Sequence, residues 1–142
     1  NGEFRASNLS ESSVWEPTLA GTTSGGANST TYTTRGGTVF SQGQLTYVWF
    51  DVAWSATAET GNLSILLPYT SFGPSDTPFI GACFASNIAY NANTPQISIS
   101  AIAGTNRGEI IQSGPSQPSA NIAMPSSGQV TGCVAYWRSE NE

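Results

Sequence analysis

Apolar and polar residues alternate with a period of two in short stretches along the chain, and clusters of Gly, Pro, Asn and Ser separate these stretches. This alternation is typical of β-strands, whose successive side chains point to opposite faces. No run of ten residues has the apolar spacing of a helix, and the strong helix formers Lys, Glu, Leu and Met are scarce. The predicted strands are Val14–Leu19, Thr30–Thr34, Thr38–Ser41, Gln44–Ser55, Leu63–Leu67, Phe79–Ser86, Gln96–Ala103, Glu109–Gln112, Ala120–Met124 and Gln129–Arg138.

Eight to ten strands without a helix predict an all-β, jelly-roll-like antiparallel β-sandwich. A chain of 142 residues is long enough for one such domain. We expect a flexible N-terminal segment or linker remnant over residues 1–13, the β-sandwich domain over 14–138 and a C-terminal tail over 139–142.

Two dipeptides and one polar stretch mark the expected connections. Gln42-Gly43 is typical of a tight hairpin that joins two of the strands. Gly36-Gly37 predicts a turn, and Ser113–Pro118 predicts a surface loop.

The strand Gln44–Ser55 is apolar on both faces. One face carries Thr46, Val48, Phe50, Val52 and Trp54. The other face carries Leu45, Tyr47, Trp49, Asp51, Ala53 and Ser55. Each sheet of a sandwich has only one inner face, so a second apolar face normally marks an interaction surface. We expect the first face in the core and Leu45, Tyr47, Trp49 and Asp51 at a subunit interface. The alternative is a long loop that covers the second face.

The charge pattern excludes several classes of partner. The chain has no Lys and no His, and its four arginines are scattered singly, with a net charge of −5. Nucleic-acid binding needs clustered cations, so this partner is not expected. No apolar run approaches the ~20 residues that span a bilayer, so membrane insertion is not expected either.

The two cysteines, Cys83 and Cys133, fit neither a zinc pattern nor a redox motif. Two small buried thiols and a disulfide both remain possible. We expect no metal and no cofactor.

Several motifs occur in an order that resembles a known family. The chain has WEPTLAG over Trp15–Gly21, a Gly/Ser/Thr-rich loop, the Thr31-Tyr32-Thr33 strand and the hairpin into VWFDVAWS over Val48–Ser55. TGNLSILLPY follows over Thr60–Tyr69, and GQVTGCVAYW closes the pattern over Gly128–Trp137. This order resembles the C-terminal trimerisation and receptor-binding domain of bacteriophage tail fibres and tailspikes. The second hairpin strand departs from the family, since Gly36-Gly37 stands where relatives have an aromatic-x-x-x-Gly register.

The resemblance implies a homotrimeric, non-catalytic jelly-roll module in the virion tail. Such a module acts outside the bacterial cell in host adhesion, holds three chains together and presents a surface to a cell-surface glycan. This is the expected function.

Catalysis would need groups that the chain largely lacks. Without His or Lys the common general bases are missing, and only a pair of carboxylates could act. Asp51 is the most interesting carboxylate because it lies among aromatic residues. We expect it to pair at an interface with backbone amides or with an arginine, for which Arg35 and Arg138 are the candidates. The side chains of Glu16, Glu59 and Glu109 are expected to be solvated.

Sugar-binding residues concentrate on loops, where aromatic side chains stack on sugar rings and amides bind hydroxyl groups. The glycan-binding candidates are Phe72, Asp76, Tyr90, Asn91 and Asn93.

Two other functions remain open. A monomeric carbohydrate-binding module of a polysaccharide-degrading enzyme predicts a planar row of exposed aromatics without self-association. A small glycan hydrolase predicts that Asp51 works with a second acid.

Overall fold

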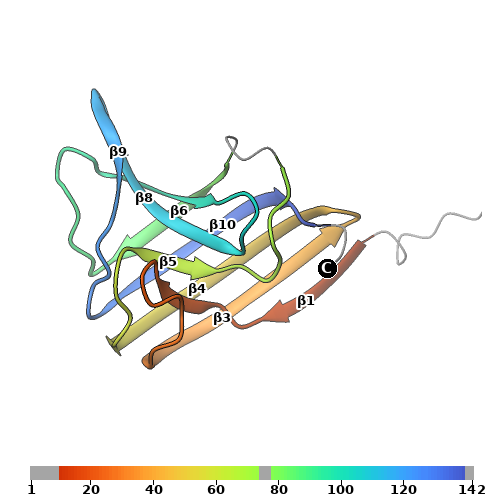
Figure 1. Cartoon of the computed structure of the whole chain (residues 1–142), viewed down its shortest axis with the longest axis horizontal. Coiled ribbons are helices and arrows are strands. Elements are labelled where there is room, and N and C mark those ends of the chain that lie inside the picture. Colours follow the sequence, from red (N-terminus) through yellow and green to blue (C-terminus); the bar gives the residue numbers. More distant parts are fainter. Residues whose placement is uncertain (1–9, 74–77, 140–142) are drawn as a thin grey trace, which may run out of the picture.

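The computed structural model describes residues 10–73 and 78–139 and contains ten strands in that part of the chain, with no helix. All strand pairs are antiparallel, and the sheet order is β1-β3-β4-β10-β6-β7-β8-β5-β2, with β9 paired to β8 (Figure 1). The strands are β1 (Ser10–Trp15), β2 (Thr18–Gly21), β3 (Thr30–Gln42), β4 (Leu45–Thr57), β5 (Leu63–Leu66), β6 (Phe79–Ser86), β7 (Gln96–Ala101), β8 (Arg107–Gly114), β9 (Gln117–Asn121) and β10 (Gly128–Trp137). The expectation of an all-β fold is therefore confirmed.

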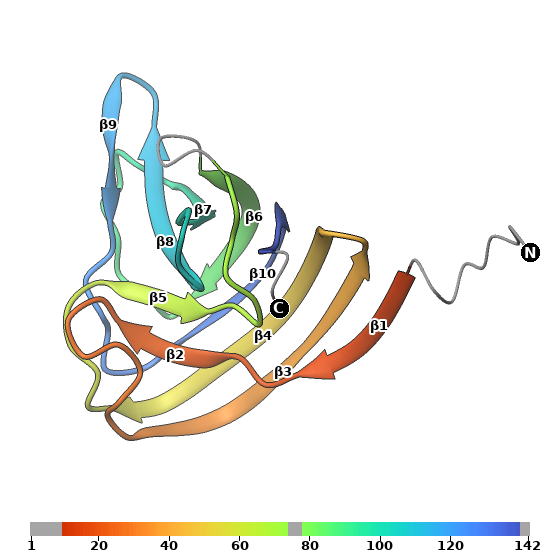
Figure 2. The same cartoon turned by 45° about the vertical axis from the view of Figure 1, so that its right-hand side comes forward.

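The sheet curls because β6 pairs with two different strands. Its first half, Phe79–Ala82, pairs with β7, and its second half, Cys83–Ser86, pairs with β10. The strands β1, β3, β4 and β10, here called the front half, consequently face β7, β8, β5 and β2, the back half (Figure 2). The front half wraps around the core, so its outer face is convex (Figure 2).

The core lies between the two halves, and β4 supplies its longest row. Burial alternates along β4, with Thr46, Val48, Phe50, Val52 and Trp54 all buried, as the sequence pattern predicted. The back half contributes apolar side chains, namely Leu19, Leu63, Ile65, Ile99 and Ile110. Removing each such side chain from water stabilises the fold by about 1.5–3 kcal/mol. The indole Nε1 of Trp54 donates a hydrogen bond to the carbonyl oxygen of Pro125 at 3.1 Å, so this buried polar atom is satisfied.

The predicted hairpin between β3 and β4 is confirmed. Gln42 pairs with Leu45, so the two-residue turn is Gly43-Gln44. Gly43 has a φ of 61°, a conformation that L-residues with a side chain rarely adopt. The glycine therefore fixes the turn and the register of the longest strand pair in the molecule.

The turn predicted at Gly36-Gly37 is wrong, because β3 continues through both residues. They pair with Asp51 and Phe50 of β4. An added Cβ atom on Gly37 would lie 2.5 Å from Nε1 of Trp15. Gly37 thus marks a close approach of an indole to the strand rather than a reversal of the chain.

The single strand predicted over Val14–Leu19 is also wrong. The chain leaves the front half at Glu16-Pro17, where Pro17 lacks an N–H for a ladder bond. β1 pairs with β3, whereas β2 pairs with β5 in the back half. Residues 10–13, expected to be loose, belong to β1, and residues 1–9 and 140–142 lie outside the described part of the chain.

The connection predicted as a surface loop over Ser113–Pro118 is a hairpin. β8 ends at Gly114 and β9 begins at Gln117, so Pro115-Ser116 forms the turn. Ser116 adopts a φ of 58°, which closes this turn without a glycine at that position. Pattern alone missed the hairpin because β9 is exposed along its whole length and has no apolar face.

Candidate functional site

Two rows of paired residues cross the outer face of the front half. The side chains of paired residues point to the same side of a sheet, so a row can be followed from strand to strand. The first row is Val14, Thr38, Trp49 and Cys133. The second row is Ser12, Phe40, Tyr47 and Ala135. These rows, together with Leu45, Asp51, Thr131, Trp137, Ile80, Ala82 and Phe84, form what we call the outer face.

The outer face exposes large apolar side chains. Their exposed fractions are 85% for Val14, 38% for Tyr47, 48% for Trp49, 61% for Ile80, 67% for Phe84 and 47% for Trp137. The four predicted interface residues all lie on this face, with Leu45 and Asp51 half-buried beside the exposed Tyr47 and Trp49. Within residues 10–73 and 78–139 no loop covers Trp49, in contrast to the alternative considered from the sequence.

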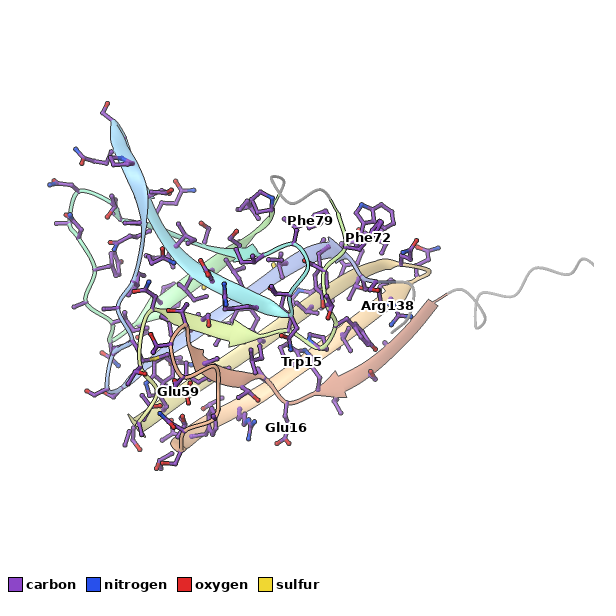
Figure 3. The ribbon with its side chains drawn as sticks, in the orientation of Figure 1. Trp15, Glu16, Glu59, Phe72, Phe79 and Arg138 are labelled. Atoms are coloured by element: carbon purple, nitrogen blue, oxygen red, sulfur yellow. The ribbon has the colours of Figure 1, made fainter. Side chains whose placement is uncertain are left out.

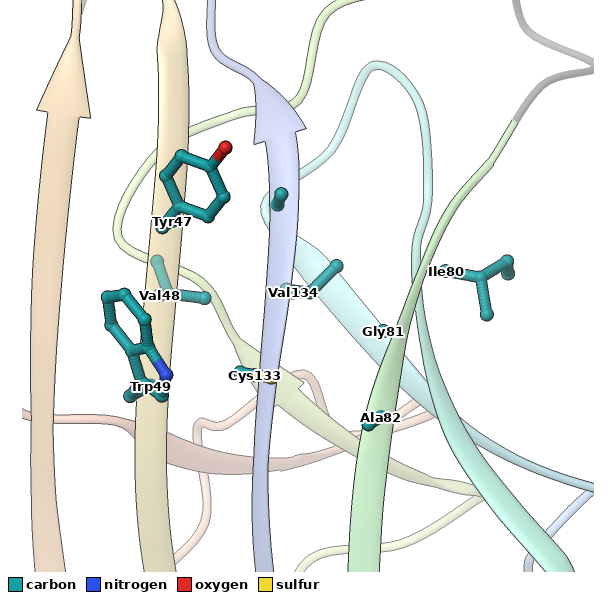
Figure 4. A pocket seen from close by; sticks show the side chains of 9 residues that line it. Tyr47, Val48, Trp49, Ile80, Gly81, Ala82, Cys133 and Val134 are labelled. Atoms are coloured by element: carbon teal, nitrogen blue, oxygen red, sulfur yellow. The ribbon is translucent and has the colours of Figure 1, made fainter.

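A hollow of about 240 Å³ opens on the outer face between β4, β10 and β6 (Figure 4). It lies beyond the point where the pairing of β10 with β6 ends, at Gly132 and Cys83, and where the two strands separate (Figure 4). Small residues line it, since Gly81, Ala82 and Ala135 carry little or no side chain. The remaining lining residues are Tyr47, Val48, Trp49, Ile80, Cys133 and Val134.

A second hollow, of about 290 Å³, lies on the other side of Trp49. Its lining comes from β3, β4 and β10 and consists of Gly36, Gly37, Thr38, Trp49, Phe50, Asp51, Thr131 and Gly132. Trp49 lines both hollows and separates them on the outer face.

Asp51 is the charged residue that lines this second hollow, and two side chains of β10 donate hydrogen bonds to it. Its Oδ1 atom accepts hydrogen bonds from Nε2 of Gln129 and from Oγ1 of Thr131, both at 2.9 Å. Neither Arg35 nor Arg138 pairs with Asp51 within one chain, and the pairing expected at an interface between chains stays a prediction. Arg35 pairs with Val52, so it lies on the opposite side of the sheet from Asp51, and its Nε donates to the carbonyl oxygen of Pro17 at 2.7 Å.

Arg138, the other proposed partner of Asp51, lies at the far end of β10. Its guanidinium carbon is 4.5 Å from the ring centroid of Tyr69, a cation–π contact. The guanidinium of Arg35 makes a similar contact, 4.3 Å from the ring of Tyr32. Both cations therefore cover aromatic rings that pack against the core, and neither neutralises the outer face.

The glycan-binding candidates do not converge on one place. Phe72 is exposed beside Arg138, and its backbone N–H donates to the carbonyl oxygen of Trp137, the last residue of β10 (Figure 3). Tyr90, Asn91 and Asn93 belong to the loop that begins near Gly128, the first residue of β10. A strand of ten residues spans roughly 30 Å, so the two groups lie at opposite ends of the sheet. Asp76 lies outside the described residues.

The loop that carries Tyr90 is shaped by its own amides. The backbone N–H of Asn93 donates to Oδ1 of Asn91 at 2.9 Å, and the backbone N–H of Asn91 donates to Oε1 of Gln112 at 2.9 Å. Tyr90 is 39% exposed. The loop therefore presents one aromatic ring and the amide of Asn93 on a braced backbone.

Glu59 was expected to be solvated, and this expectation is wrong. The carboxylate is 5% exposed and accepts hydrogen bonds from the backbone N–H groups of Gly21, Gly26 and Asn28, each at 2.7 Å, and from Oγ of Ser24 at 2.6 Å (Figure 3). Burial raises the pKa of the carboxyl, but these hydrogen bonds outweigh burial and hold the pKa below its ordinary value. The glycine-rich loop before β3 could have indicated this contact from the sequence, because such a loop leaves backbone N–H groups available to bind a carboxylate.

The other two glutamates that were expected to be solvated differ from each other. Glu16 is exposed. Glu109 is half-buried and accepts from Nε of Arg107 at 3.0 Å and from Nδ2 of Asn121 at 3.1 Å. Glu59 and Glu109 are thus held by partners on elements other than those that surround Asp51.

Cys83 and Cys133 are free thiols on neighbouring strands. Cys133 belongs to the outer face, whereas Cys83 packs against the core. Burial raises the pKa of the Cys83 thiol to about 12, and the nearby Cys133 adds to this effect. The pair therefore combines one accessible thiol with one that resists ionisation.

Among the described residues no cluster of three or more His, Cys, Asp or Glu side chains could hold a metal ion. The same part of the chain contains no helix long and apolar enough to cross a membrane. The chain matches no protein-family model, no curated protein and no solved structure.

Proposed function

We propose that this chain is a non-catalytic module that assembles as a homotrimer through its outer face, as in the C-terminal domain of phage tail fibres and tailspikes. The main support for this proposal is the set of exposed aromatic and aliphatic side chains on the outer face of the front half. Exposed apolar faces of this kind mark interaction sites in soluble proteins.

The size of the outer face suits an interface between chains. Counting roughly 100 Å² for each half-exposed aromatic or large aliphatic side chain, the six exposed ones supply on the order of 600 Å². A stable interface buries about 800 Å² on each partner, and the largest patch on a monomer is usually about 300–600 Å². The face is therefore large enough to hold two chains together once its half-buried neighbours are included.

The composition of the face favours a second copy of the same chain as the partner. Tyr47, Trp49 and Trp137 are of the residue types enriched in interface cores, from which charged residues are depleted. Among the described outer-face side chains only Asp51 carries a charge. An apolar, nearly uncharged face complements itself, and most soluble oligomers are symmetric assemblies of one chain.

The shape of the face and the sequence resemblance both support a ring of three. A convex face can point its crest, β4, at a three-fold axis while its two sides meet two neighbours. The curled sheet is then one jelly-roll-like sandwich of the trimer, with β6 as the strand shared by its two layers.

Glycan binding in the virion is the second part of the proposal. The loop with Tyr90 and Asn93 lies away from the two rows that would form the interface, at the start of β10. An exposed ring beside an amide can stack on a sugar and bind its hydroxyl groups. Tyr90→Ala is expected to remove binding to host-surface polysaccharide in affinity electrophoresis while leaving the oligomer intact.

The test of trimerisation compares Trp49→Asp with a matched control. Placing a charge at the crest of the outer face is expected to convert the oligomer to single chains in light scattering after size exclusion. Ser119→Asp adds the same charge on exposed β9 and should leave the mass unchanged. An oligomer that survives Trp49→Asp would remove the outer face from the interface.

One observation favours a second candidate function, a monomeric carbohydrate-binding module. The rings of Tyr47 and Trp49 are stacked on an open surface, and Asp51 lies next along the strand. This function predicts that the unmodified chain is a monomer whose retardation by soluble polysaccharide is lost in Trp49→Ala.

A further inference from the structure

The outer face has two different sides at the same height along the strands. On one side of β4 lies the hollow between β10 and β6, whose outward residues Ile80, Ala82, Cys133 and Ala135 we call the hollow side. On the other side lie Val14 of β1 and Phe40 of β3, which we call the ridge side.

We infer that the ridge side of one copy packs into the hollow side of the next copy, so that the interface is head-to-tail and closes into a ring. This inference rests on the trimer proposed above and adds the identity of the residues that meet. Tyr47 and Trp49 then lie between the two contacts, next to the axis.

The strand register places the two sides opposite each other. Val14 belongs to the row that ends at Cys133, and Phe40 belongs to the row that ends at Ala135. In a ring whose axis runs along the strands, copies are related by rotation alone, so residues at one height meet residues at the same height. Val14 and Phe40 therefore reach the hollow of the neighbour without any slip along the strands.

The shapes of the two sides are complementary. The hollow of about 240 Å³ is several times the ~30 Å³ that one water occupies in the liquid, so it can accept a side chain. Val14 is 85% exposed and stands on an edge strand next to Ser12 and Ser13, which add little bulk beside it. None of the ridge-side or hollow-side residues is charged, so filling the hollow leaves no buried charge unpaired.

A two-fold contact through the same residues would fit less well. A two-fold axis along the strands also sets the ridge side of each copy over the hollow side of the other. Two convex faces touch first at their crests, however, so Trp49 would meet Trp49 and the two sides would be held apart. The hollow would stay empty, and Val14 would remain in water. The head-to-tail contact instead buries the most exposed large apolar residue of the described chain in the hollow.

A mixing experiment tests the inference, with Val14→Asp to disable the ridge side and Ala82→Asp to disable the hollow side. Both residues are exposed, so both substitutions are compatible with folding, which circular dichroism verifies. Each variant alone is expected to sediment as a single chain. An equimolar mixture is expected to form a pair of two chains, because one variant keeps its ridge and the other keeps its hollow.

The outcomes separate the two proposals. Suppose that the wild-type chain is a trimer. If the mixture then forms no pair, or if either variant alone remains trimeric, the head-to-tail contact is overturned and the trimer still holds. A wild-type chain that sediments as a monomer overturns the trimer itself.

A cross-linking measurement gives an independent readout. In a Cys83→Ser background, Val14→Cys is expected to form a disulfide with Cys133 of the neighbouring copy on mild oxidation. Non-reducing gels should then show species of up to three chains, whereas Ser119→Cys in the same background should show none. A trimer that yields no cross-link through Val14→Cys contradicts the inference.

Discussion

The rings of Tyr47 and Trp49 stack on the outer face of β4, with 6.2 Å between their centroids and 21° between their planes. Their neighbours in the strand, Val48 and Phe50, are buried in the core. A single strand thus presents one apolar row to its own domain and another to solvent. The inner row forms part of the hydrophobic core, and the outer row provides the surface on which the proposed assembly depends.

The reactivity of the two thiols should report on assembly. Thiolates react with maleimides, and burial raises the pKa of Cys83 to about 12, so this residue is expected to stay unmodified at neutral pH. Cys133 lines the hollow and should react in the dissociated chain but be protected in the oligomer. Mass spectrometry of labelled samples over a dilution series measures this, with Cys133→Ser as the blank. Equal labelling of Cys133 at all concentrations would argue against a buried hollow.

The adjacent glycines Gly36 and Gly37 should respond differently to substitution. A Cβ atom on Gly36 meets nothing within 4 Å, whereas one on Gly37 would clash with the indole of Trp15 and lie 2.9 Å from the carbonyl oxygen of Trp49. Gly37→Ala is expected to lower the free energy of unfolding by about 1–3 kcal/mol through overpacking. Gly36→Ala should change it by less than about 0.5 kcal/mol. Urea unfolding measures both, and equal effects would mean that Trp15 does not lie against Gly37.

Glu59 should make stability depend on acid pH. Its folded pKa lies below the unfolded value, so the stabilisation is complete above the unfolded pKa and is lost as the pH falls through the folded pKa. Glu59→Gln removes the charge that four donors share and is expected to cost roughly 2–3 kcal/mol at neutral pH.

Unfolding free energies from pH 7 down to pH 3 measure this dependence. The acid-induced loss should be smaller in Glu59→Gln than in the unmodified chain. Glu109→Gln is the control, because its ion pair with Arg107 is partly solvated and worth at most about 1 kcal/mol. An unchanged pH profile in Glu59→Gln would show that the loop does not depend on this carboxylate.

The sequence pattern predicted the parts of the fold that follow from alternation and from turn chemistry. The buried row of β4 was predicted because Val48, Phe50, Val52 and Trp54 repeat with period two. The hairpin at Gly43 was predicted because glycine supplies the positive φ that a two-residue turn needs.

The contacts that pattern could not predict depend on residues far apart in sequence. Gly37 looked like a turn residue. A glycine is needed there because the indole of Trp15, which belongs to another strand, occupies the space that a Cβ atom would take. Glu59 looked solvated because its donors, at the end of β2 and in the loop before β3, lie more than 30 residues away in sequence. Asp51 was given an arginine partner because only the register shows that Gln129 and Thr131 lie beside it.

The outer face is proposed to join three copies of this chain. Sedimentation equilibrium of the unmodified chain at micromolar concentration tests it most directly. The proposal predicts a mass three times the 14.8 kDa of one chain, falling towards one chain on dilution or in Trp49→Asp. A single-chain mass at every concentration would contradict it.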